Sequence, residues 1–216
     1  MCLNSFQTIL ESIYGIDAGH WVEDFLITDA KLASELDTSL NARENMEKLL
    51  LRPCPEGLDI ALYLDPAVVE HLGRENPLCS LHGGNLNDFW IALEGVSHFI
   101  YLIWNACLNK SVTLMELEMQ AEVDKYVASL CLIMRQERRW LSRQIRENLF
   151  NGVHFDEKLD DQSLTRYKDA NFFAGKYCMQ LEYRYLRKKR SRMMIEDVRD
   201  FYRLPQGEKI RRIMHC

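Results

Sequence analysis

Residues 85–108 read NLNDFWIALEGVSHFIYLIWNACL, and this stretch decides the architecture of the chain. Large apolar side chains recur on almost every side of the helix that it predicts: Phe89, Trp90, Leu93, Val96, Phe99, Ile100, Leu102, Ile103, Trp104 and Leu108. A helix that is apolar all round lies in the centre of a fold. Its most apolar part, residues 96–108, is shorter than the roughly 20 residues of a membrane span. We therefore expect a buried core helix and no membrane-spanning segment.

The polar residues of this helix fall on one stripe. Glu94 and His98 are four residues apart, and Tyr101 and Asn105 continue the same helical face. A second helix is expected to begin at Ser111 or Thr113 and to run past residue 139, and it carries another pair at the same spacing. This pair is Glu118 and Glu122, which lie near Lys125. Because the connection between the helices is short, we expect antiparallel neighbours whose polar faces meet.

Two interpretations of these faces remain open. In one, Glu94, His98, Glu118 and Glu122 bind a divalent iron, manganese or zinc ion, because residues at i and i+4 place two ligands on one side of a helix. His154 or Asp156, from a polar connector, is then a candidate for the open side. In the other interpretation the cluster is a metal-free buried network. Its members are Glu94, His98, Tyr101, Asn105, Glu118, Glu122 and Lys125, together with an arginine from the C-terminal third.

Outside these two helices the sequence predicts a small sheet and further helices. Strand-like alternation covers residues 21–27, and residues 48–52 and 58–64 flank a Pro/Gly turn as in an antiparallel hairpin. Shorter helices are expected at 3–14, 29–36 and 65–72, with Asp29 and Asp65 as N-caps. Later helices are expected at 162–187, 193–203 and 207–214. The fold class is therefore α+β and helix-dominated, with a sheet or hairpin in the N-terminal third followed by a bundle of long helices.

We expect one domain over residues 1–216, with a mixed α/β acidic subregion at 1–80 and a helical bundle at 85–216. Charge divides the chain further. Residues 1–134 hold 7 Lys and Arg against 20 Asp and Glu, whereas residues 135–216 hold 20 against 12. Either the two parts neutralise each other by packing, or the basic C-terminal third is offered to an acidic partner.

The basic residues cluster most densely in one segment, where tyrosines are interleaved: Arg184, Arg187, Lys188, Lys189, Arg190 and Arg192. The leading hypothesis is an interaction or regulatory module that uses this basic patch to bind an acidic protein partner. A metal-dependent enzyme is the alternative, and nucleic-acid binding is a second alternative. No membrane partner is expected. The sequence does not decide whether the chain is an enzyme, since no standard catalytic motif is present.

The cysteines indicate the compartment. There are seven, which is an odd number, they are widely spread, and no C-x-x-C pair occurs. This pattern argues against a disulfide framework and is typical of reduced thiols. The first residues also lack the features of a secretory signal. We therefore expect a cytoplasmic protein.

Overall fold

The computed structural model describes residues 3–37, 46–55, 57–137, 142–152 and 160–215. This part of the chain forms a helix-dominated α+β fold, as the sequence predicts. Its α-helices are α1 (Leu3–Tyr14), α2 (Ala30–Leu36), α3 (Pro66–Arg74), α4 (Leu86–Cys107), α5 (Leu114–Arg135), α6 (Ser142–Phe150), α7 (Asp161–Arg184), α8 (Ser191–Arg203) and α9 (Gln206–Met214). Its strands are β1 (Leu26–Ile27), β2 (Glu47–Cys54) and β3 (Gly57–Leu64), and its short 3-10 helices include η1 (Val22–Phe25) and η3 (Leu186–Lys188).

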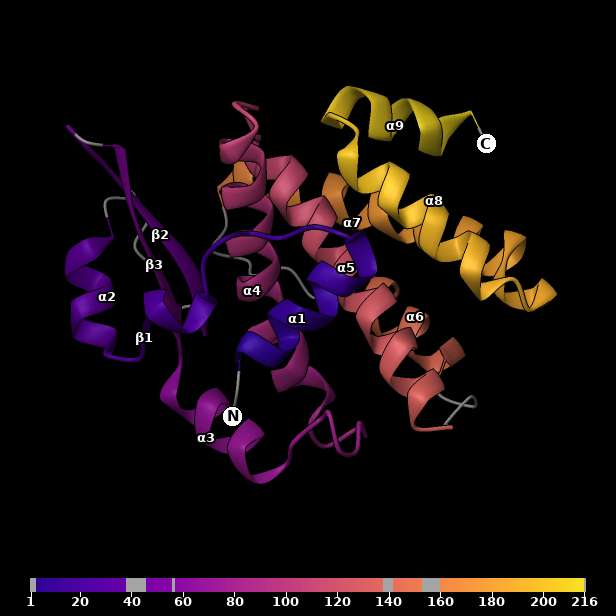
Figure 1. Cartoon of the computed structure of the whole chain (residues 1–216), viewed down its shortest axis with the longest axis horizontal. Coiled ribbons are helices and arrows are strands. Elements are labelled where there is room, and N and C mark those ends of the chain that lie inside the picture. The colour runs from indigo at the N-terminus through magenta and orange to yellow at the C-terminus, as the bar shows by residue number, and fades with distance from the viewer. Residues whose placement is uncertain (1–2, 38–45, 56, 138–141, 153–159, 216) are drawn as a thin grey trace.

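The sheet has the strand order β1-β3-β2. β2 and β3 form the predicted antiparallel hairpin, in which Leu49 is opposite Leu62. β1 adds a two-residue parallel edge, with Leu26 opposite Leu62. Figure 1 shows this sheet and α2 at one end of the long axis, and the turn between α7 and α8 at the other end.

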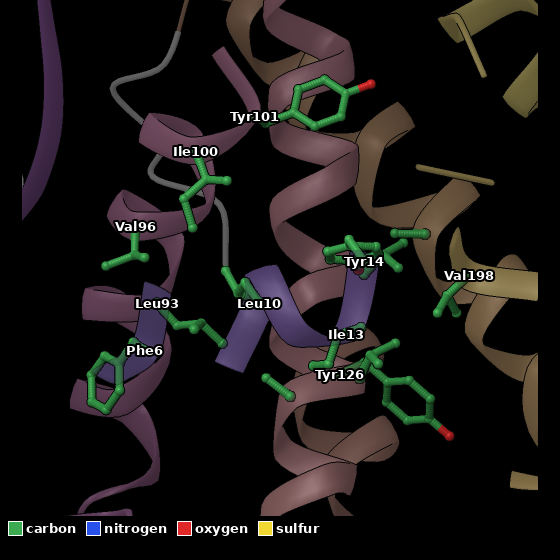
Figure 2. Close-up of a cluster of buried hydrophobic side chains, with 14 of the residues drawn as sticks. Phe6, Leu10, Ile13, Tyr14, Leu93, Val96, Ile100, Tyr101, Tyr126 and Val198 are labelled. Atoms are coloured by element: carbon green, nitrogen blue, oxygen red, sulfur yellow. The ribbon is translucent and has the colours of Figure 1, made fainter. Parts of the chain in front are cut away.

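Helices α4 and α5 occupy the centre of the molecule. α4 contacts the sheet, α1 and α3, and α5 packs between α4 and α7. Helix α1 lies across both central helices and turns Phe6, Leu10 and Ile13 toward them (Figure 2). The Phe6 ring meets the edge of Phe89 with ring centres 5.2 Å apart. The apolar periphery of α4 is therefore buried by a different neighbour on each side, as its composition predicts.

Local signals predicted several helix starts correctly. The side chain of Asp29 accepts hydrogen bonds from the backbone of Lys31 (2.8 Å) and Leu32 (3.2 Å), so it caps α2. Asp65 caps α3 through the amide of Ala67 at 2.8 Å. Thr113 caps α5 through the amide of Glu116 at 3.1 Å. These caps satisfy amides that have no acceptor inside the helix.

Three predicted boundaries are wrong. Residues 21–27 form the 3-10 helix η1 and only two residues of strand, because α1 supplies the hydrogen bonds that a sheet neighbour would give. The amide of Val22 donates to Gln7 Oε1 at 2.8 Å, for example. Helix α5 ends at Arg135 rather than past residue 139, since Glu137 has a left-handed backbone (φ 57°) and the side chain of Gln136 binds the loop before α4. Helix α7 ends at Arg184, three residues early, and η3 follows.

Helix α6 was not predicted, and it packs against α5 and α7. None of the helices in the described ranges combines the length and apolar composition that a membrane crossing requires.

Candidate metal centre

The structure brings five of the seven predicted network residues together between α4 and α5. Glu94 and His98 come from one turn of α4, and Glu118, Glu122 and Lys125 come from α5. The short connection does make these helices antiparallel neighbours (Figure 1). A sixth residue, Glu47 at the start of β2, joins them and was absent from the sequence prediction.

Lys125 holds one side of this cluster. Its Nζ lies 2.5 Å from Glu94 Oε2 and 2.8 Å from Glu122 Oε1. Burial lowers the pKa of Lys125, but the two carboxylates outweigh this effect and raise it above its ordinary value. Burial raises the pKa of Glu94, but Lys125 and His98 bring it below its usual range. The lysine is therefore charged and pairs with at least one ionised carboxylate.

His98 lies between two further carboxylates. Its Nδ1 is 3.6 Å from Glu47 Oε1 and its Nε2 is 3.7 Å from Glu118 Oε2. Both distances exceed a hydrogen bond. The imidazole is only 9% exposed, so water does not replace these partners freely. Burial lowers the pKa of His98, but the surrounding carboxylates of Glu47, Glu118 and Glu94 raise it to about 9.

The cluster has more negative than positive side chains. Four carboxylates (Glu47, Glu94, Glu118 and Glu122) surround one lysine and one histidine. Burial raises the pKa of Glu118 to about 7 and also raises the pKa values of Glu47 and Glu122. Removing carboxylates from water is costly unless a positive charge or a proton compensates each of them. The arrangement therefore favours the uptake of positive charge.

Several polar atoms of the cluster have no hydrogen-bond partner among the described residues. They include Glu47 Oε1, His98 Nε2 and Glu122 Oε2. One potential ligand atom from each of Glu47, Glu94 and His98 lies within 4.8 Å of the others. Atoms at these separations can share one cation, because a metal ion takes nitrogen and oxygen ligands at about 2.0–2.2 Å. Glu47 Oε1 and His98 Nδ1, at 3.6 Å, are too far apart to form a hydrogen bond with each other.

Gly95 makes the contribution of Glu47 possible. It lies between Glu94 and His98 on α4, where the β2-β3 hairpin approaches the helix. A Cβ at this position would lie 2.6 Å from Leu62 Cδ1 and 2.9 Å from Glu47 Cγ. A glycine beside two polar residues of a buried helix is a sequence signal of close approach, but it does not name the residue that approaches.

Tyr101 and Asn105 belong to a different network, toward α9. The Tyr101 hydroxyl donates to Glu116 at 2.6 Å and accepts from Lys209 Nζ at 2.7 Å. Lys209 is fully buried and also donates to Gln120 Oε1 at 2.8 Å. Asn105 donates to the backbone carbonyl of Tyr101. This second network anchors α9 in the core and stays apart from the carboxylates around His98.

Lys209 gives the folded state a pH dependence that can be measured. Burial lowers the pKa of Lys209 to about 7 from an ordinary value of 10.5. Between these values the unfolded chain binds more protons at this lysine than the folded chain does. The contribution of Lys209 to stability therefore rises with pH, by up to about 1.4 kcal/mol per unit. His98, whose pKa is raised to about 9, contributes a slope of opposite sign in the wild type and in Lys209→Met alike. We therefore expect urea unfolding between pH 7.5 and 9.5 to show a more positive slope of stability against pH in the wild type than in Lys209→Met. Equal slopes in both proteins would show that folded Lys209 keeps its charge.

The basic residues of the C-terminal third divide into two groups. Arg199 and Arg203 turn inward and donate to backbone carbonyls at the end of α1, including those of Ile13 (2.7 Å) and Tyr14 (3.1 Å). In the predicted basic patch, Arg184 is half-buried, and the remaining members are exposed: Arg187, Lys188, Lys189, Arg190 and Arg192. Arg199 and Arg203 are therefore used in packing against the acidic half, whereas the exposed residues of the basic patch remain in contact with solvent.

The supplementary candidates His154 and Asp156 lie outside the described residues. No family model, no curated protein and no solved structure matches the chain.

Proposed function

We propose that this chain binds one divalent metal ion between α4, α5 and β2, with Glu47, Glu94 and His98 as ligands. One observation carries the proposal: the three side chains converge from two elements, and Glu47 Oε1, which faces His98 Nδ1 at 3.6 Å, has no hydrogen-bond partner among the described residues. A divalent cation would satisfy these atoms and compensate the surplus of carboxylates.

The donor set indicates the class of metal. Imidazole nitrogen suits zinc, iron and similar transition metals, whereas carboxylate oxygen also suits manganese and magnesium. One histidine with two carboxylates therefore favours manganese, iron or zinc over calcium. Three protein ligands also leave coordination positions for water or substrate, which is the arrangement of catalytic rather than structural sites.

The surroundings would support a metal-dependent enzyme. Glu118 Oε2 lies 3.7 Å from His98 Nε2, on the side of the imidazole opposite Glu47, where it would orient the ring whose Nδ1 faces the ion. Glu94 and Glu122 are 25% and 20% exposed, so water reaches this side of the cluster. Lys125 fixes both carboxylates and supplies positive charge.

Isothermal titration with Mn²⁺ and Zn²⁺ tests the proposal on protein that has been freed of metal and then of chelator. We expect one site per chain, and binding about 100-fold weaker or more in His98→Gln and Glu47→Gln, because each substitution removes a ligand. His82→Gln is a matched control, since His82 forms an exposed ion pair with Glu75 at 3.3 Å, away from the cluster.

The opposite result supports the metal-free network. If neither ion binds to the wild-type protein, and His98→Gln destabilises it at every metal concentration, the six residues are structural. The free energy of unfolding gives a second readout. If the ion binds, metal at 100 times its dissociation constant should raise this free energy by about 2.7 kcal/mol in the wild type but not in the ligand variants.

A further inference from the structure

The turn between α7 and α8 presents a dense cluster of positive charge, here called the basic tip. It consists of Arg187, Lys188, Lys189, Arg190 and Arg192, which are all exposed. Figure 1 places this turn at the end of the long axis that lies farthest from the sheet. Nearby Glu182 pairs with Arg146, outside the tip, at 2.8 Å, and Glu196 pairs with one tip residue, Arg192, at 3.3 Å, which leaves the other four tip cations. The tip therefore keeps a strong net positive charge.

An exposed apolar row on α7 leads to the basic tip. It comprises Phe172, Met179 and Tyr183, which are 57%, 51% and 64% exposed. Spacings of seven and four residues place the three side chains on one face of the helix. The guanidinium carbon of Arg187 lies 5.3 Å from the centre of the Tyr183 ring, so the row and the tip are continuous. We call these three residues the α7 row.

Large apolar side chains beside a cluster of cations match the layers of an anionic bilayer. Cations contact the headgroups while neighbouring apolar side chains enter the boundary of the acyl region. We propose that the basic tip and the α7 row bind the surface of an anionic lipid membrane. The charge of the rest of the molecule supports this orientation, since residues 1–134 carry 13 more acidic than basic side chains and are repelled by such a surface.

The structure favours this partner over single-stranded nucleic acid. Nucleic acid of that kind stacks its bases on exposed aromatic rings. Of Tyr183, Tyr185 and Tyr202, which lie among the basic residues, two are turned inward, however. Tyr185 donates its hydroxyl to Asp197 at 2.8 Å, and Tyr202 is buried. Tyr183 remains exposed, with Arg187 over its ring, and the exposed ring of Phe172 lies about three helical turns away from it. An acidic protein, the partner that the sequence favours, would use the cations, and it becomes one outcome of the test.

Flotation with lipid vesicles tests the proposal on the full chain. The probes are vesicles of 70% phosphatidylcholine with 30% phosphatidylglycerol, and vesicles of phosphatidylcholine alone. We expect binding to the anionic vesicles only, and weaker binding as salt rises. Each cation near an anionic surface contributes about fivefold to the partition coefficient, so Lys188→Gln with Lys189→Gln should weaken binding about 25-fold. Phe172→Gln with Met179→Gln should weaken it severalfold further.

Matched variants come from elsewhere on the surface. Lys31→Gln with Arg74→Gln removes two exposed cations far from the tip, and Leu114→Gln removes an apolar side chain that is 57% exposed. Both controls should bind the anionic vesicles as the wild type does. All of these positions are exposed, so thermal unfolding should stay close to wild type in each variant.

Three results overturn the proposal. One is failure of the wild type to bind the anionic vesicles, and another is binding that the tip variant leaves unchanged. The third is binding to soluble polyglutamate or single-stranded RNA that is as strong as binding to the anionic vesicles and is not weakened by Phe172→Gln with Met179→Gln. That result would assign the tip to an acidic protein or to nucleic acid. None of these results depends on metal, so they are separate from the test of the metal centre.

Discussion

Replacement of Lys125 by methionine will lower the free energy of unfolding of the metal-free protein by about 3–5 kcal/mol. Lys125 is the ammonium partner of Glu94 and Glu122, at 2.5 and 2.8 Å, and its side chain is only 9% exposed. Methionine fills a similar volume but leaves both carboxylates without their positive partner. Chemical denaturation of the chelated protein measures the loss directly.

Metal binding beside Glu94 would give Lys125→Met a second measurable property. Saturating Mn²⁺ should restore part of the lost stability, because a divalent cation beside Glu94 replaces some of the missing positive charge. Lys168→Met, on the exposed surface of α7, is the control and should change stability by less than about 0.5 kcal/mol. A loss of the same small size in Lys125→Met would mean that the carboxylates are neutral in the folded protein and that no charged cluster exists.

Alanine at Gly95 will damage the fold and the metal centre together. The added Cβ would lie 2.6 Å from Leu62 Cδ1 and 2.9 Å from Glu47 Cγ, so the hairpin must move away from α4. Overpacking of this kind costs about 1–3 kcal/mol, even though alanine favours the helix over glycine. Because Glu47 moves with the hairpin, we also expect metal affinity to fall by at least about tenfold.

Gly207→Ala is the matched control for Gly95→Ala. Gly207 also lies in a helix, but nothing stands within 4 Å of the Cβ that alanine would add. This control should be neutral or stabilised by up to about 1 kcal/mol. Unchanged stability and unchanged metal titration in Gly95→Ala would show that the hairpin tolerates displacement and that Glu47 does not depend on this contact.

Much of the fold was predictable because its signals are local. Asp29, Asp65 and Thr113 cap helices through amides two or three residues away, so a short window of sequence contains the whole interaction. Helix α6 escaped prediction because its sequence, SRQIRENLF, has few apolar residues, and its burial depends on α5 and α7. The strand predicted over residues 21–27 was longer than the observed β1, because hydrogen bonding to α1 competes with sheet pairing in this segment.

In the candidate site, only the residues that share a helical face were predictable from the sequence. Spacing of four residues paired Glu94 with His98 and Glu118 with Glu122, and helix geometry is sufficient for that step. Glu47 could not be predicted, since it is distant in sequence and reaches the site only through the packing of the hairpin on α4.

Tyr101 was placed on the correct stripe but assigned to the wrong neighbours. At His98 this helix meets β2, whereas two turns beyond Glu94 it meets Lys209 of α9. One helical face thus serves two networks, because its neighbours change along its length. Helical spacing predicts which residues share a face, and tertiary packing decides what each of them contacts.

Elemental mass spectrometry of the wild-type protein, purified without a histidine tag and without chelator, tests the central claim most directly. The account predicts about one equivalent of manganese, iron or zinc per chain, retained through gel filtration and absent from Glu47→Gln and His98→Gln preparations that remain folded. Less than about a tenth of an equivalent of any of these metals, in protein that also takes up none when they are added, would contradict it. The six residues around His98 would then be a structural network of the core.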